Sequence, residues 1–202
     1  MNKHLLDIPL CAKKDAQSFG KGDNTVTRDE FEYLLIKYEK DIYSICIRLT
    51  QNQCEAEELF QDTWLAAMEQ MHRIDFKKNP RSYLIGKAIF LWKAKKRKFA
   101  RRQRIAPLIN MEDQSDETFY VSETPSLEQQ AEKQEMVHTL REEVRQLKDK
   151  YRIVVELHYA MDLTASQIAD ILKIPRGTVE SRLYKARKLL RNRMEELGYE
   201  IE

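Results

Sequence analysis

The stretch LTASQIADILKIPRGTVESRLYKARKLL, residues 163–190, decides the interpretation of this chain because it has the pattern of a helix-turn-helix. Thr164 followed three residues later by Gln167 is a capping box, which predicts the start of a first helix. Pro175 stands where a second helix would begin, after a short turn. Two helices joined in this way can place the second one in the major groove of duplex DNA.

The second predicted helix has an apolar side and a polar side. The apolar positions recur at steps of three and four residues, so they are expected to pack on the first helix; they are Val179, Leu183, Ala186 and Leu190. The other side carries basic and hydrogen-bonding groups of the kind that read base edges. These candidate DNA contacts are Arg176, Thr178, Glu180, Ser181, Arg182 and Lys185. An ordinary helical hairpin with a solvated charged face is the alternative.

Composition favours a helical protein of two small domains. The 202 residues are 34% charged, with only five Gly and five Pro, and the mean hydropathy is −0.65. The apolar run at the N-terminus is short and is interrupted by Asp7 and Pro9, so it does not resemble a signal peptide, and no window approaches a membrane span. The three cysteines lack metal-site spacing and are expected to be reduced thiols. We therefore expect a cytoplasmic protein.

Charge is strongly segregated along the chain. Residues 76–111, the basic segment, contain no acidic residue but twelve cations. Segregation on this scale indicates a polyanionic partner, and nucleic acid suits it best. A basic helix lying on an anionic membrane is the alternative. Aromatic residues at helical spacing within the segment look like packing anchors inside a domain, which argues against that alternative.

The periodicity predicts three helices in the first half of the chain. Residues 1–26 lack sustained periodicity and are expected to be a mobile lead. A helix is predicted from Thr27 to about Thr50, a second begins after Asn52 with Glu55 in a capping position, and a third follows Pro80 and continues to about residue 104. Residues 27–104 are therefore expected to form one helical domain.

The second half is predicted to be a linker followed by a four-helix domain. Residues 105–125 carry five acidic side chains, no basic residue and little periodicity, which is typical of a flexible linker. Ser126 and Gln129 then form another capping box, and a helix around residues 151–161 precedes the helix-turn-helix. The fold class expected is all-α, with two small helical domains, 27–104 and 126–202, joined by the acidic linker.

Two stretches resemble the sigma factors of bacterial RNA polymerase, in particular the small extracytoplasmic-function (ECF) class, and the resemblance covers about residues 28–195. LKDKYRIVVELHYAMDLTASQIADILKIPRGTVESRLYKARKLL, residues 147–190, resembles region 4 of the family, and EAEELFQDTW, residues 55–64, resembles region 2.2. The chain departs from the usual pattern in the third helix, where it has Lys87, Phe90 and Ala94. The first domain would then be sigma region 2, a bundle of three or four helices, and the second sigma region 4.

The resemblance implies a factor that directs core RNA polymerase to promoters, reading DNA at two places. The helix-turn-helix would bind the −35 element through the six residues given above. The first domain would recognise the −10 element as a melted single strand, which needs a positive surface along the backbone. The implied −10 contacts are His72, Arg73, Lys77, Lys78, Asn79, Lys93, Lys96, Arg97 and Arg101. Trp92 and Phe99 are expected in the core rather than stacked on bases.

The resemblance also implies protein partners. Region 2.2 would dock on the clamp coiled coil of the polymerase's largest subunit, and the polymerase flap would be a second contact. The implied docking residues are Glu55, Glu58, Leu59, Gln61, Asp62 and Trp64. Factors of this class are commonly held inactive by an anti-sigma factor, often membrane-bound, which would hold this chain at the membrane.

No enzyme chemistry is expected. The histidines His4, His72, His138 and His158 form no metal-ligand motif, and no phosphate-binding glycine loop or nucleophile setting is present. We therefore expect no cofactor, metal or small-molecule substrate. The remaining rivals are a repressor or activator that binds duplex DNA alone, and a non-specific nucleic-acid-binding protein that uses the basic segment.

Overall fold

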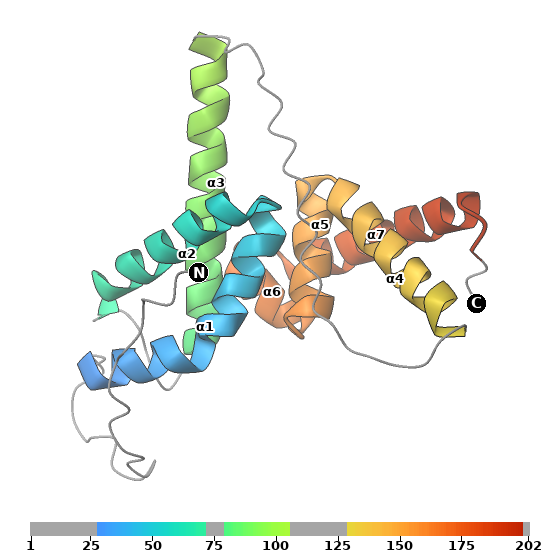
Figure 1. Cartoon of the computed structure of the whole chain (residues 1–202). Coiled ribbons are helices and arrows are strands. Elements are labelled where there is room, and N and C mark those ends of the chain that lie inside the picture. The colour runs from blue at the N-terminus through green and yellow to red at the C-terminus, as the bar shows by residue number, and fades with distance from the viewer. Residues whose placement is uncertain (1–27, 72–78, 106–128, 200–202) are drawn as a thin grey trace, which may run out of the picture.

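The computed structural model describes residues 28–71, 79–105 and 129–199, and these residues are helical almost throughout (Figure 1). The elements are α1 (Arg28–Thr50), α2 (Gln53–Met68), α3 (Pro80–Ile105), α4 (Gln129–Gln146), α5 (Asp149–Val155), a π-helical turn (Glu156–Ala160), α6 (Ala165–Leu172) and α7 (Arg176–Glu196). No strand occurs in these three ranges. The all-α fold class expected from the sequence is confirmed. Within the same ranges, no helix has the length and apolarity needed to cross a bilayer.

Helices α1, α2 and α3 form the first domain, on the left of Figure 1. Their apolar faces meet in a core whose fully buried side chains include Leu34, Ile42, Ile45, Leu59 and Leu84. The Trp64 ring makes edge-to-face contacts with Phe31 and Phe60, at centroid distances of 5.9 and 6.2 Å. As predicted, Asn52 caps α2, because its Oδ1 accepts a hydrogen bond from the Glu55 amide at 3.0 Å.

Helices α4 to α7 form the second domain, and α6 and α7 are the predicted helix-turn-helix. The Thr164 capping box is present: the Gln167 amide donates to Thr164 Oγ1 at 3.3 Å, and the Thr164 amide donates to Gln167 Oε1 at 2.9 Å. Helix α6 ends at Lys173, whose φ of 55° turns the chain. Pro175 then serves as the N-cap of α7, one residue before the helix rather than within it.

The helix predicted around residues 151–161 is interrupted by the π-helical turn. Its closing hydrogen bond runs from the Met161 amide to the Glu156 carbonyl at 3.1 Å. Behind it, fully buried Val154, Leu157 and Ile168 form the core of the second domain. The predicted capping boxes at Thr27 and Ser126 lie outside the described residues, as do the N-terminal lead and most of the linker.

The assignment of Phe99 to the core, made from the sequence, is wrong. Phe99, which shares helical spacing with Trp92, is 56% exposed, whereas Trp92 is buried as predicted. The reason is tertiary. The C-terminal part of α3 extends beyond the bundle, as Figure 1 shows, so no other helix reaches its apolar positions. Periodicity gives the side of a helix on which a residue lies but not where the neighbouring helices end.

Candidate nucleic-acid and polymerase interfaces

The outward face of α7 is held in place by a buried stripe on its other side. Val179, Leu183 and Ala186 are buried, as their spacing predicted. The six candidate residues for the −35 element all lie in the N-terminal half of the helix. Four are exposed, Arg176, Glu180, Ser181 and Lys185, and two are half-buried, Thr178 and Arg182. This face is therefore open along the side that a groove would meet.

Internal pairs partly organise this face. Arg176 Nε and Glu180 Oε1 form an exposed ion pair at 2.7 Å, and Ser181 Oγ donates to the Thr178 carbonyl at 3.1 Å. Tyr184, which lies between Arg182 and Lys185 in the sequence, was missed by the sequence analysis. Its side chain is 70% exposed. Its place three residues after Ser181 is the signal that could have found it, since such positions share a helix face.

The exposed part of α3 is a row of cations. Lys93, Lys96, Arg97 and Arg101 are all exposed, and Phe90 and Phe99 present exposed rings on the same helix. Asn79 lies at the start of α3, where its Oδ1 accepts a hydrogen bond from the Ser82 amide at 3.1 Å, so its side chain serves as a helix cap. The candidates His72, Arg73, Lys77 and Lys78 lie outside the described residues.

The acidic face of α2 has the carboxylates at the surface but not the two large apolar residues. Glu55, Glu58 and Gln61 are exposed and Asp62 is half-buried. Lys95 of α3 pairs with Glu58 at 3.1 Å and with Asp62 at 2.7 Å. Burial alone would lower the pKa of Lys95, but these two carboxylates outweigh it and raise that pKa.

Leu59 and Trp64, which the sequence placed beside these carboxylates, lie in the domain core instead. Leu59 is 0% and Trp64 7% exposed. Their apolar surface is used by α1 and α3, so they position the acidic face from beneath and leave direct contact to the polar residues. The α2 sequence places all six residues within three turns, but only packing decides which of them stay at the surface.

The two described cysteines differ sharply in environment, and we expect them to react differently. Cys46 is buried, and burial raises the pKa of its thiol to about 12, whereas Cys54 is exposed. Because the thiolate is the reactive form, Cys46 of the native protein should react at least about a thousandfold more slowly than a free thiol. Iodoacetamide labelling at pH 8 followed by peptide mass spectrometry measures both sites. Equal labelling of Cys46 and Cys54 in the folded protein would contradict the burial of Cys46.

The fold and these surfaces define a helical protein of two domains. The second domain contains a helix-turn-helix, and the first contains a basic helix. Comparison with known families identifies both domains. Residues 34–103 match Sigma-70 region 2, and residues 138–190 match Sigma-70, region 4, so the two matches together cover more than half of the chain.

Individual relatives agree with these matches. The chain is similar to the ECF RNA polymerase sigma factor SigW of Bacillus subtilis, with 28% identity over 191 residues that cover 94% of this chain and all of SigW. It is 24% identical to the RNA polymerase sigma-H factor of Pseudomonas aeruginosa, over 79% of this chain and 83% of that protein. Its fold resembles that of the sigma factor RpoE in complex with the anti-sigma factor NepR from Bartonella quintana, with a TM-score of 0.68 at 19% identity, covering 83% of this chain and 98% of that one.

The chain belongs to the sigma-70 family, as an ECF sigma factor of RNA polymerase that acts in promoter-specific transcription. The family is not a class of enzymes. The surfaces of α2 and α3 described above belong to region 2 of this family, and the surface of α7 belongs to region 4.

Proposed function

We propose that the second domain reads the −35 element of its promoters through the outward face of α7. The observation that carries this is the set of exposed residues Arg176, Glu180, Ser181 and Lys185. Their helix is fixed on its opposite side by buried Val179 and Leu183. A helix held in this way can enter a major groove as a rigid body. Arg182 and Lys185 would contact bases or phosphates, and Glu180 could accept a hydrogen bond from a cytosine amino group. Tyr184 joins this set because of its exposure.

We propose that the first domain holds the melted −10 element along α3. Lys93, Lys96, Arg97 and Arg101 supply a positive track for the backbone, and exposed Phe90 and Phe99 offer rings on which bases could stack. Asn79 and residues 72–78, of which the latter lie outside the described residues, would supply the remaining contacts to the −10 element. The region boundaries that follow are 27–104 for the −10 reader and 126–202 for the −35 reader, joined by residues 105–125.

We propose that the α2 face of Glu55, Glu58, Gln61 and Asp62 docks on the clamp of the polymerase's largest subunit, and that the second domain contacts the flap. Helix faces suit a helical partner, and Lys95 neutralises part of the carboxylate charge without covering it. An anti-sigma factor is a further proposed partner. The similarity to RpoE, solved in complex with NepR, supports it. The proposed site of action is the cytoplasm, with retention at the membrane by such a factor.

Reconstituted transcription tests the proposed function. We expect the purified chain alone to bind promoter DNA weakly, and the chain with core RNA polymerase to give run-off transcripts from a promoter that carries both elements. Templates with either element scrambled are the controls, and each should lose the transcript. Tight, specific duplex binding without polymerase, together with no transcript in its presence, would favour a repressor or activator. Binding that is indifferent to sequence would favour the non-specific rival.

A further inference from the structure

We propose that Lys87, positioned by Gln70, selects a guanine in the melted −10 strand while the Phe90 ring holds that base by stacking. The inference rests on the proposed recognition of the −10 element along α3. It adds the residue that distinguishes one base from another and the base that it selects. Lys87 and Phe90 are among the positions at which the third helix departs from the usual family pattern, so this preference belongs to this chain.

The cationic track proposed on α3 holds DNA without distinguishing sequences. Its cations meet phosphates, which are the same at every nucleotide, and a ring such as Phe90 stacks on any base. Discrimination requires a polar group that reaches the edge of a stacked base. A residue that supplies this group must therefore lie on the same side of α3 as an exposed ring.

Lys87 meets this requirement. Steps of three, four and seven residues define one side of α3, and the members of that side include Tyr83, Lys87, Phe90, Arg97 and Arg101. Phe90 is 61% exposed. Lys87 precedes it by three residues, so their Cβ atoms are neighbours about 5–6 Å apart. The long lysine side chain can thus reach the edge of a base that lies on the Phe90 ring.

The ammonium group of Lys87 is held in place by neutral partners. Its Nζ donates to Gln70 Oε1 at 3.0 Å and lies 5.8 Å from the centroid of the Tyr83 ring. Gln70 is itself fixed in the turn that follows α2, where its amide donates to the Ala67 carbonyl at 3.2 Å. Neither partner of Lys87 in the described part of the chain is a carboxylate, so these contacts position its charge without neutralising it.

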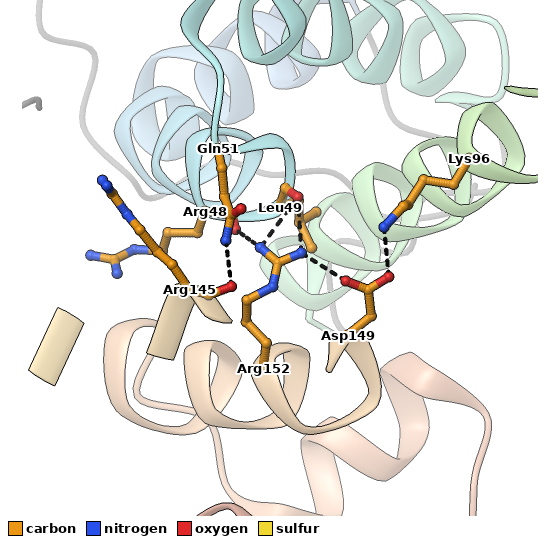
Figure 2. Close-up of polar contacts among 7 residues, drawn as sticks. All are labelled: Arg48, Leu49, Gln51, Lys96, Arg145, Asp149 and Arg152. Atoms are coloured by element: carbon orange, nitrogen blue, oxygen red, sulfur yellow. Dashed lines mark hydrogen bonds and ion pairs between the residues drawn. The ribbon is translucent and has the colours of Figure 1, made fainter. Parts of the chain in front are cut away.

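Lys96 illustrates the opposite case, in which an acid neutralises a lysine of α3. Its Nζ pairs with Asp149 of the second domain at 2.7 Å, and Asp149 also pairs with Arg152 (Figure 2). Lys87, in contrast, is half-buried beside an exposed ring and contacts an amide oxygen. A charged donor in that environment is suited to the electron-rich edge of a base.

The number of available protons favours guanine. An ammonium group has three protons, and one of those on Lys87 donates to Gln70. The remaining two match O6 and N7 of guanine, which are adjacent acceptors on one edge of the base. Adenine has an amino group beside N7, so it would present a donor to a donor. Cytosine and thymine have a single ring and overlap less with Phe90.

Selection of −10 sequences by the reconstituted holoenzyme tests this inference. The chain with core RNA polymerase is mixed with promoter duplexes whose −10 region is single-stranded and randomised, and the bound molecules are sequenced. We expect the unmodified chain to enrich guanine at one position. Lys87→Met retains a side chain of similar length without the charge. It should reduce the guanine preference at that position by roughly five- to 150-fold and leave the other positions unchanged.

Three further variants separate base reading from a structural role. Lys87→Arg should retain the guanine preference, because a guanidinium also donates to O6 and N7. Gln70→Ala keeps the charge but removes its positioning group, and should reduce the preference less than Lys87→Met does. Lys93→Met is the matched control, because Lys93 is an exposed lysine of α3 that is proposed to contact phosphate. It should weaken binding of all sequences about equally. The same uniform weakening in Lys87→Met would overturn the inference.

Modified bases identify the atoms that are read. At the selected position, 7-deazaguanine lacks the N7 acceptor and should weaken binding by the unmodified holoenzyme at least about twofold. Hypoxanthine keeps O6 and N7 and should bind nearly as well as guanine. Lys87→Met should bind guanine and 7-deazaguanine equally. A penalty for hypoxanthine without one for 7-deazaguanine would place the contact on the other edge of the base and contradict the inference.

The selection also distinguishes failure of this inference from failure of the proposed function. If the holoenzyme selects a −10 sequence and Lys87→Met selects the same one, only the inference fails. The same conclusion follows if the position that depends on Lys87 prefers another base. If the unmodified chain with core polymerase enriches no −10 sequence, the proposed function fails and the inference fails with it.

Discussion

Replacement of Leu84 by alanine is expected to destabilise the protein by about 2–5 kcal/mol. Leu84 is 0% exposed at the centre of the first domain, so the shorter side chain leaves a cavity that the surrounding helices can fill only in part. The denaturation midpoint in urea should fall, with little change in the dependence of the unfolding free energy on denaturant. Transcription with core polymerase should be lost at temperatures where the unmodified chain is still active, since α2 and α3 carry two of the proposed interfaces.

Leu65→Ala is the matched control for this change. It removes the same atoms from α2, where the leucine is 55% exposed, and is expected to cost less than about 0.5 kcal/mol. Equal costs for the two substitutions would mean that Leu84 is not in the core.

Replacement of Arg182 by alanine is expected to reduce discrimination between promoters by about 1–3 kcal/mol, or roughly five- to 150-fold. Arg182 lies half-buried on the outward face of α7, next to exposed Ser181 and Lys185. Loss of a base contact should weaken binding to the correct −35 element and leave binding to a scrambled element nearly unchanged. Competition between the two templates for the reconstituted holoenzyme measures the ratio.

Arg101→Ala provides the contrast. Arg101 is exposed on the part of α3 that extends beyond the bundle and is proposed to contact phosphate. Its removal should weaken binding about equally for all sequences and lower the salt dependence of binding by about one unit of slope. If Arg182→Ala behaved in the same way, Arg182 would be a phosphate contact rather than a base contact.

The helices and the helix-turn-helix could be predicted from the sequence because their signals are local. A capping box such as Thr164 with Gln167 involves atoms within one helical turn, so its geometry depends little on the rest of the protein. The same holds for Asn52 at the start of α2. The buried stripe of α7 was also predictable, because a helix of regular pitch keeps residues at three- and four-residue steps on one side.

Predictions that depended on the ends and neighbours of helices were less successful. Phe99 was expected in the core but lies on a part of α3 that no other helix covers. Leu59 and Trp64 were expected beside the acidic face of α2 but are buried beneath it. In both cases the helix itself was predicted correctly. Whether a residue on it is buried depends on which other helix packs against that part of it.

The sequence by itself determined the family, the all-helical fold and the two candidate reading surfaces, because each is encoded in short stretches whose side chains act together. Only the tertiary structure decided how the two domains meet. The contacts of Arg152 with the Arg48 and Leu49 carbonyls join residues more than one hundred positions apart, and the acceptors are backbone atoms that any residue would supply. A pattern of side chains in the sequence cannot predict a contact with backbone acceptors. Arg152 is therefore indistinguishable in the sequence from the other basic residues, and only the folded structure shows that it is buried and caps a helix.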